Sequence, residues 1–187
     1  MNANHQNLCG GPDWADYLRA NVLSTLVSAG DLGERMLELG PGPGAATDWL
    51  RQRVRHLVAV EVDRDAAEAL AARYVDGNVT VRVGDCTATG LPTASFDSVG
   101  SFTMLHHLPT TGEQRAMLAE AFRVLVPGGV FLGSDSLASV GLHHFHVDDT
   151  YNPIDPARLL VLLQAEGFYP VTVTVGEDLT FRAVRPR

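Results

Sequence analysis

The strongest constraint on this chain is a glycine-rich run between an expected strand and an expected helix. Residues 36–39 have the apolar character of a short strand, and Gly40, Gly42 and Gly44 follow, alternating with prolines. Glycine has no Cβ, so it allows a sharp turn and a close approach of a ligand to the backbone. The first N–H groups of the helix expected over residues 45–54 would face the same ligand. The run therefore predicts a ligand-binding turn, although a tight turn without a ligand would use the same residue types.

The glycine pattern alone admits more than one nucleotide. It fits the dinucleotide spacing, with Gly40, Gly42 and Ala45 in the three slots. Glu61 ends the next expected strand, where a carboxylate can accept both ribose hydroxyls of NAD or of S-adenosylmethionine. A helix cap is the alternative for Glu61, but Asp63 is better placed for that. These residues predict an adenosine ribose site and leave the cofactor open.

Strand and helix patterns alternate along the chain, and two strands close it as a hairpin. Such alternation predicts an α/β fold with a mostly parallel sheet and helices on both faces. Strands are expected over residues 36–39, 57–62, 79–83, 96–102, 130–133, 171–175 and 179–184, and helices over 14–29, 45–54, 63–74, 113–125 and 156–167. Residues 134–152 are expected to be irregular. No linker interrupts the pattern, so residues 1–187 are expected to form a single domain, with residues 1–30 as an N-terminal helical flap.

Charge and composition limit the binding partners and the cellular location to be expected. The formal net charge is -8, so an acidic surface would repel a phosphate backbone, and no nucleic acid is expected. Cys9 and Cys86 make no disulfide framework, which favours a reduced, cytoplasmic protein. No apolar stretch approaches the roughly 20 residues that span a membrane. A homodimer is left open.

Further segments make the pattern specific. Gly84-Asp85-Cys86 ends the third expected strand, and residues 96–99, 105–109 and 125–129 are Phe-Asp-Ser-Val, Leu-His-His-Leu-Pro and Leu-Val-Pro-Gly-Gly. With the glycine run and its acids, these segments resemble the class I S-adenosylmethionine-dependent methyltransferases, in particular the small-molecule subgroup that includes the ubiquinone and menaquinone C-methylating enzymes. This resemblance implies a single methyltransferase domain, a Rossmann-like three-layer sandwich with a mostly parallel seven-stranded sheet whose last strand is antiparallel.

The resemblance also implies S-adenosylmethionine as the cofactor and a set of residues around it. These residues are Glu38, Gly40, Gly42, Gly44, Glu61, Asp85, Cys86, Ser101 and Phe102. Glu38 and the glycine loop would surround the methionine part, and Glu61 would hold the ribose. Asp85 would accept from the adenine amino group, with the Cys86 N–H facing the ring. Ser101 and Phe102 would lie beside the sulfonium. Acids suit this cofactor because it carries a sulfonium and an ammonium and no pyrophosphate.

Histidines are the candidate catalytic residues. Methyl transfer from a sulfonium mainly requires alignment in a dry cleft, and a base is needed only for an oxygen or carbon acceptor. The candidates are His106, His107, His143, His144 and His146, of which His107, His143 and His146 are the expected catalytic residues. The alternatives are that His106 and His107 only pack locally and that the other three histidines lie on a plain surface loop. The last three, with Asp148 and Asp149, have residue types that bind zinc or iron, but metal is not part of this family's usual chemistry, so none is expected.

Apolar and aromatic side chains are expected on the acceptor side. The candidates are Trp14, Tyr17, Met104, Phe145 and Tyr151, for which ordinary core packing is the alternative. Residues 134–152 and the flap would close over the acceptor, which is predicted to be a small, partly hydrophobic molecule. Two other functions stay open. One is a non-catalytic S-adenosylmethionine-binding protein. The other is a nicotinamide-dependent oxidoreductase, which the complete lack of lysine disfavours.

Overall fold

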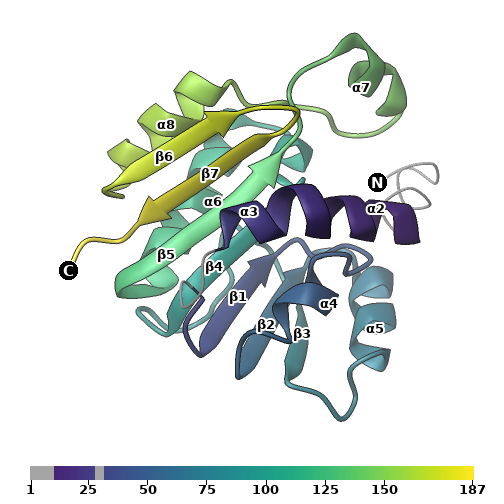
Figure 1. Cartoon of the computed structure of the whole chain (residues 1–187), viewed down its shortest axis with the longest axis vertical. Coiled ribbons are helices and arrows are strands. Elements are labelled where there is room, and N and C mark those ends of the chain that lie inside the picture. Colours follow the sequence, from purple (N-terminus) through teal and green to yellow (C-terminus); the bar gives the residue numbers. More distant parts are fainter. Residues whose placement is uncertain (1–10, 28–31) are drawn as a thin grey trace.

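One sheet of seven strands organises the fold. The computed structural model describes residues 11–27 and 32–187. The strands are β1 (Arg35–Leu39), β2 (His56–Glu61), β3 (Val79–Val83), β4 (Phe96–Phe102), β5 (Leu125–Asp135), β6 (Val171–Val175) and β7 (Leu179–Val184). Their order across the sheet is β3-β2-β1-β4-β5-β7-β6 (Figure 1). The first five pair in parallel, and β7 is antiparallel to both β5 and β6, which confirms the expected sheet.

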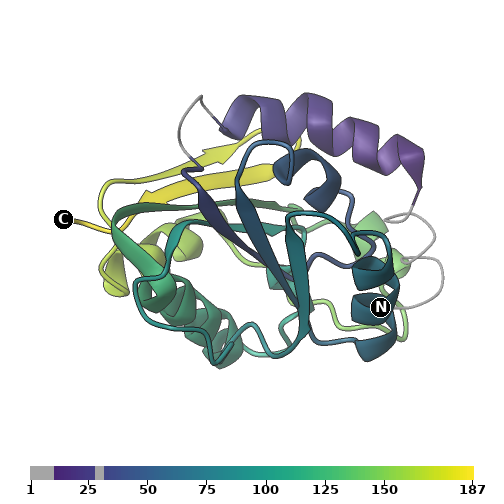
Figure 2. The ribbon, with the colours of Figure 1, turned by 90° about the horizontal axis from the view of Figure 1, so that it is seen from below.

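Helices cover both faces of this sheet (Figure 2). One face carries α2 (Pro12–Tyr17), the π-helix η1 (Leu18–Leu23), α3 (Ser24–Leu26), α4 (Thr47–Leu50) and α5 (Arg64–Ala72), and the other carries α6 (Thr111–Val124) and α8 (Pro156–Ala165). Successive strand residues point to opposite faces. Met36 accordingly packs with Leu18 and Leu70, whereas Leu37 belongs to the core that contains Met117 and Leu159. The three-layer arrangement is therefore confirmed.

The N-terminal helical segment differs from a single α-helix over 14–29. It begins at Pro12, and its middle is a π-helix. The hydroxyl of Ser24 donates to the Ala20 carbonyl, and the hydroxyl of Thr25 donates to the Asn21 carbonyl. Hydroxyls that bond the preceding turn compete with the helical ladder and loosen it. Residues 1–10 and 28–31 of the expected flap lie outside the described part.

Three other segments also differ from expectation. The helix expected over 45–54 is only α4, because Gly44 has a φ of 87° and turns surround it. Strand β5 exceeds the expected 130–133 because Leu125 already pairs with Phe96 across a register shift. Residues 134–152 are not wholly irregular: Ser139 caps the helix α7 (Val140–Phe145) through its hydroxyl. None of the described helices has the length and apolar character needed to cross a bilayer.

Candidate active site

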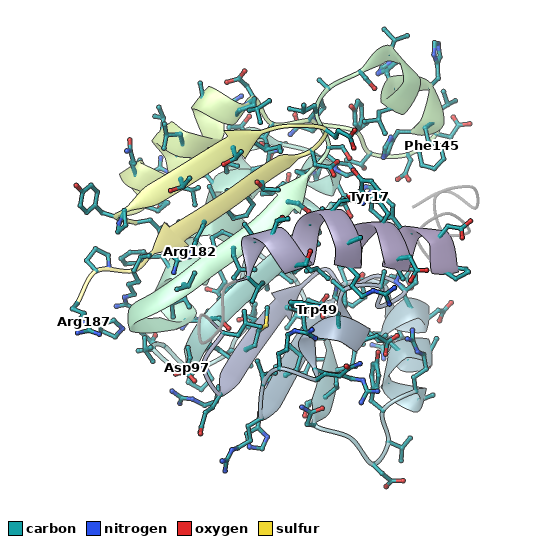
Figure 3. The ribbon with its side chains drawn as sticks, in the orientation of Figure 1. Tyr17, Trp49, Asp97, Phe145, Arg182 and Arg187 are labelled. Atoms are coloured by element: carbon teal, nitrogen blue, oxygen red, sulfur yellow. The ribbon has the colours of Figure 1, made fainter. Side chains whose placement is uncertain are left out.

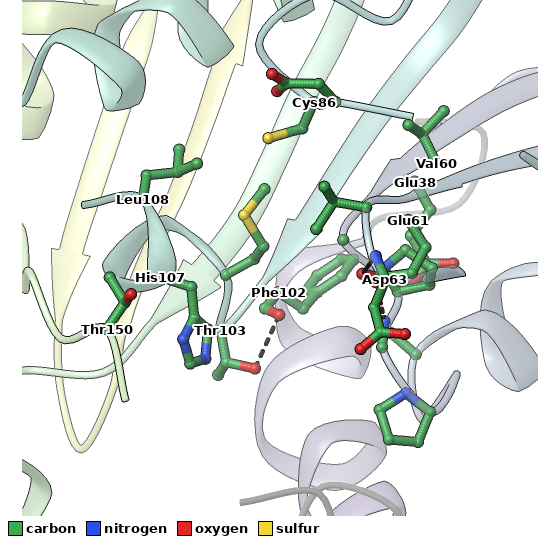
Figure 4. Close-up of a pocket in the computed structure, with 18 of the residues that line it drawn as sticks. Glu38, Val60, Glu61, Asp63, Cys86, Phe102, Thr103, His107, Leu108 and Thr150 are labelled. Atoms are coloured by element: carbon green, nitrogen blue, oxygen red, sulfur yellow. Dashed lines mark hydrogen bonds between the residues drawn. The ribbon is translucent and has the colours of Figure 1, made fainter. Parts of the chain in front are cut away.

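A cavity of about 540 Å³ opens at the carboxyl ends of β1, β2, β3 and β4. Ligands of open α/β sheets bind at this edge, beside the point where the strand order reverses, here between β1 and β4. The cavity size suits a small organic ligand. Figure 4 shows Glu38, Glu61 and Asp63 on one side of this pocket and His107, Leu108 and Thr150 on the other. Ten of the predicted residues line it: Trp14, Glu38, Gly40, Gly42, Glu61, Asp85, Cys86, Phe102, Met104 and His107.

The glycine loop meets the pocket at Gly40 and Gly42. Gly40 has a φ of 65°, donates its N–H to the Val60 carbonyl at 2.9 Å, and leaves no room for a Cβ, which would lie 2.3 Å from Met104 Cγ. Gly44 does not line the pocket. A Cβ there would lie 2.4 Å from a methyl carbon of Leu70 in α5. Gly44 thus lets the loop pack closely on a neighbouring helix.

Glu38, near the end of β1, is a buried carboxyl on the pocket wall. Its side chain is 1% exposed, and its Oε2 accepts a hydrogen bond of 2.7 Å from the Thr47 hydroxyl. The pKa of Glu38 is raised to about 7, chiefly by burial. The Thr47 bond lowers this pKa, and the nearby acids Asp48 and Glu61 add smaller increases. A group that titrates near neutrality in a cleft is typical of a functional site.

Glu61, the last residue of β2, joins the loop to the next helix. Its Oε2 accepts from the Gly42 N–H and its Oε1 from the Asp63 N–H, both at 3.0 Å. Asp63 caps α5 as expected, its carboxylate accepting from the Ala66 N–H at 3.1 Å. Each Glu61 oxygen keeps capacity for a further donor, because a carboxylate oxygen has two lone pairs. Glu61 is therefore more than a surface acid.

Asp85 and Cys86 follow β3 at the pocket rim. Asp85 is exposed, and its Oδ1 accepts from the Thr87 N–H at 2.8 Å and the Thr87 hydroxyl at 2.7 Å. Burial and the adjacent Asp85 charge raise the pKa of the Cys86 thiol to about 12. The thiol is therefore neutral and a poor nucleophile at neutral pH. Cys9 lies outside the described residues.

The carboxyl end of β4 turns into the pocket through an unusual backbone. Phe102 and Met104 line the wall, and Thr103 between them has a φ of 51°, which is rare for a β-branched residue. The Thr103 hydroxyl donates to the Phe102 carbonyl (Figure 4), and its N–H donates to the Ser134 carbonyl. Ser101 is buried outside the pocket wall, because neighbouring strand residues face opposite sides.

The N-terminal segment supplies one expected pocket residue and holds another away from the cavity. Trp14 lines the pocket, whereas the Tyr17 hydroxyl donates to Asp178 Oδ2 at 2.6 Å. This bond raises the pKa of Tyr17 to about 12 and ties the helical segment to the turn between β6 and β7. Trp14 and Tyr17 stack with ring centroids 5.5 Å apart.

The predicted histidines separate into three environments. His107, in the short 3-10 helix η2 (Leu105–His107), lines the pocket. His146 is buried beside it with ring centroids 5.5 Å apart, but it is not part of the wall. His143 and His144 are exposed on α7. The structure therefore brings two of the three expected catalytic histidines together and places His143 elsewhere.

Segment 134–152 reaches the pocket through residues that were not predicted. Asp149 and Thr150 line the wall, whereas Phe145 and Tyr151 do not. Figure 3 shows Phe145 on α7, at the outer edge of the molecule. Other unpredicted wall residues include Val62, Asp63, Thr103, Leu108 and Glu113. Asp63 could have been found from its position two residues after Glu61, but Thr150 carries no comparable signal.

Comparison with known proteins identifies the family. A family model described as a methyltransferase domain matches residues 37–133, just over half of the chain. A probable S-adenosylmethionine-dependent methyltransferase of Mycolicibacterium smegmatis is 34% identical over 143 residues, which are 73% of this chain and 52% of that protein. Ribosomal RNA small subunit methyltransferase A of Aromatoleum aromaticum is 47% identical over 53 residues, 28% of this chain and 20% of that protein. The chain thus spans about half or less of the length of these curated relatives.

A solved structure shares the fold. Phosphoethanolamine N-methyltransferase 2 of Haemonchus contortus, in complex with S-adenosyl-L-methionine, superposes with a TM-score of 0.76 at 17% identity, over 93% of this chain and 53% of that one. The family model covers the segment from β1 to β5, which includes the glycine loop, Glu38 and Glu61. The chain therefore belongs to the class I S-adenosylmethionine-dependent methyltransferases.

Proposed function

We propose that the pocket binds S-adenosylmethionine and that the chain transfers its methyl group to a small, partly hydrophobic acceptor. The observation that carries this proposal is that the pocket has an acidic wall, with Glu38, Glu61 and Asp85, and an opposite wall where apolar side chains lie beside His107 and Thr150 (Figure 4). When bound, the cofactor supplies a methyl group on a positive sulfonium, already activated for displacement. The acidic wall suits its two cationic groups.

The residues of the acidic wall fit the parts of such a cofactor. Glu38 would face the cationic methionine part beside the glycine loop. Glu61 would accept the ribose hydroxyls with the lone pairs that the backbone N–H groups leave. Asp85 and Cys86 would contact the adenine at the pocket rim. Gly40 and Gly42 line the pocket without a Cβ, which would let the ligand approach the loop backbone closely.

The opposite wall supports a small acceptor. Phe102, Met104 and Leu108 offer apolar contact and would exclude water from the reacting atoms. His107 would take the proton from an oxygen or carbon acid, and a nitrogen acceptor would not need it. Resemblance to the ubiquinone and menaquinone subgroup makes quinone precursors the first acceptors to test.

Two observations leave specific alternatives for the experiment. An rRNA methyltransferase is among the relatives, although the net charge of -8 opposes RNA binding. A cofactor-binding protein without transfer would show the same acidic wall. Both alternatives make predictions about turnover that differ from those for a small-molecule enzyme.

Thermal unfolding with S-adenosylhomocysteine and with NAD tests the cofactor. A ligand at about 100 times its dissociation constant adds roughly 2.7 kcal/mol to the free energy of unfolding. We expect a shift with S-adenosylhomocysteine and none with NAD, and the reverse result would overturn the cofactor assignment. Formation of S-adenosylhomocysteine from S-adenosylmethionine with quinone precursors, a metabolite extract or RNA then tests the acceptor. Turnover with RNA alone would replace the small-molecule acceptor, and binding without turnover on any of them would favour the non-catalytic alternative.

A further inference from the structure

Three histidines from two separate segments meet at the apolar end of the pocket. His106 and His107 follow β4 in η2, and His146 follows α7. One ring nitrogen of each lies within 4.8 Å of a ring nitrogen of each of the others. His106 and His146 are only 2% and 4% exposed, and His107 is half-buried on the pocket wall.

Hydrogen bonds at Nδ1 orient two of these rings. His106 Nδ1 lies 2.5 Å from Oδ1 of the fully buried Asp135, which also accepts from the backbone N–H groups of His106 and Ser136. His146 Nδ1 lies 2.7 Å from the Leu142 carbonyl oxygen, which can only accept. A neutral ring that donates from Nδ1 carries its lone pair on Nε2. Metal-binding histidines are typically held this way, with the second nitrogen donating to a carboxylate or a carbonyl.

Hydrogen bonds outside the histidine rings also hold the two segments together. Asn152 donates its N–H to the His106 carbonyl at 2.8 Å and its side-chain amide to the Leu108 carbonyl at 2.9 Å. The buried Gln114 amide donates to the carbonyls of both Leu105 and Asn152. The histidines therefore sit in a preorganised arrangement, as a metal site of defined geometry requires.

We propose that His106, His107 and His146 bind one zinc ion, or a similar divalent transition metal, at the acceptor side of the pocket. Imidazole nitrogen is a preferred ligand of such ions, and Asp135 contributes a buried negative charge behind the site. Three protein ligands leave a fourth position, which is typical of catalytic zinc. This set differs from the metal-binding group considered from the sequence, which was His143, His144 and His146 with Asp148 and Asp149. Only His146 belongs to both groups.

The position of His107 gives the ion a consequence for the acceptor. His107 shares the pocket wall with Asp149 and Thr150, so the fourth position borders the cavity. An acceptor with a hydroxyl or carboxylate oxygen could take that position. This last step rests on the proposed methyl transfer, whereas metal binding itself does not. With the ion bound, the ring of His107 would coordinate it and would not act as the base; the ion would instead lower the pKa of an acceptor hydroxyl bound at the fourth position.

Metal titration of the whole chain tests the site. Protein stripped with a chelator is titrated with Co²⁺, followed by visible absorption, and with Zn²⁺ by calorimetry. We expect one ion per chain, with a Co²⁺ spectrum of low coordination number. His107→Gln and His146→Phe should abolish this spectrum, and the Phe ring preserves the stacking on Tyr151, now 4.5 Å between centroids. Asp135→Asn should weaken binding 10–100-fold, the usual effect of losing an outer partner.

The double variant His143→Ala/His144→Ala is the matched control, because both residues are exposed on the helix that leads into His146. Its metal affinity should equal that of the wild type. Absence of saturable Co²⁺ binding by the wild type overturns the proposal, as does equal binding by the His107 and His146 variants or loss in the control. If His146→Phe fails to fold, His107→Gln on the half-buried wall decides. S-adenosylhomocysteine binding, measured in the same samples, separates failure of the metal site from failure of the cofactor site.

Discussion

The hydroxyl of Thr47 donates a hydrogen bond of 2.7 Å to the carboxyl of Glu38, and both side chains are buried. A charge-assisted bond of this kind favours the ionised carboxylate. Burial acts in the opposite direction and prevails, raising the pKa of Glu38 to about 7. The carboxyl therefore changes its charge in the range where the protein would work, and both ligand affinity and stability should depend on that change.

The affinity for S-adenosylhomocysteine should rise with pH between about 6 and 8. In the proposed binding mode, its ammonium group would be attracted by Glu38 only after the carboxyl ionises, with a pKa of about 7. Glu38→Gln keeps the shape and an oxygen that can accept from Thr47, but it cannot become negative. Calorimetry across this pH range should show weaker binding and a flat profile for the variant. Glu34→Gln, on an exposed acid, is the control and should retain the wild-type slope.

The stability of the ligand-free protein should change in the opposite direction. Between pH 4.5 and about 7 the unfolded carboxyl loses its proton while the folded one keeps it. The folded chain then binds more protons, so the contribution of Glu38 to the free energy of unfolding falls as pH rises. The two pKa values differ by an amount equivalent to roughly 3 kcal/mol at most. Glu38→Gln should therefore be more stable than the wild type at pH 8 and similar at pH 4.5. Equal unfolding curves at pH 8 would contradict an ionised, buried Glu38.

Glu61→Gln should weaken both the loop and the ligand site. In the wild type, the two oxygens of Glu61 accept from the N–H groups of Gly42 and Asp63. A glutamine has only one side-chain oxygen, so its NH₂ group would face one of these N–H donors and that hydrogen bond would be lost. A hydrogen bond to a charged group contributes about 1.5–3 kcal/mol, and we expect a loss of that order in S-adenosylhomocysteine affinity with a smaller loss in stability. Calorimetry and thermal unfolding measure the two effects. Glu68→Gln on the exposed side of α5 should change neither.

The fold and the acidic half of the site could be predicted because their signals are local. The glycine loop, Glu61 and Asp63 lie within one strand–turn–helix–strand unit, where sequence spacing nearly determines spatial position. The position of Ser101 outside the pocket wall could not be predicted in this way, because a one-residue offset on a strand changes the face that a side chain occupies. The grouping of the histidines escaped prediction for another reason: the segments of His106 and His146 are joined through Asn152 and Gln114, and pairings between distant segments leave no periodic pattern.

Gly40→Ala should disturb the pocket through one identifiable clash. Its Cβ would lie 2.3 Å from Met104 Cγ, and the residue has a φ of 65°. Gly90→Ala separates the steric clash from the backbone strain of a positive φ. Gly90 has a φ of 67° but no atom within 4 Å of the position that a Cβ would take. We expect Gly40→Ala to lose more stability than Gly90→Ala and to bind S-adenosylhomocysteine more weakly. Adding Met104→Ala should recover part of the difference, with a coupling of about 0.5–3 kcal/mol. If the effects of Gly40→Ala and Met104→Ala on stability are additive, the Met104 side chain moves aside without cost and the clash is not the cause.

Tyr17→Phe should loosen the N-terminal helical segment without altering the acidic wall. The variant loses the 2.6 Å bond from the Tyr17 hydroxyl to Asp178, which ties α2 to the turn between β6 and β7, while Phe keeps the stacking on Trp14. Since the pKa of Tyr17 is about 12, the hydroxyl stays protonated and the bond should persist from pH 6 to 9. A net loss of about 0.5–1.5 kcal/mol in holding the segment corresponds to a roughly two- to tenfold change in its opening equilibrium.

Because Trp14 lines the pocket, this loosening should appear as faster dissociation of S-adenosylhomocysteine in stopped-flow experiments and faster hydrogen exchange over residues 12–26. Tyr169→Phe, on a tyrosine that is 73% exposed, is the control and should match the wild type. Asp178→Asn retains an acceptor oxygen for the hydroxyl and should have an intermediate effect. Faster exchange with an unchanged dissociation rate would mean that the segment moves independently of the ligand. It would then pack on the sheet as part of the core and would not act as a flap over the pocket.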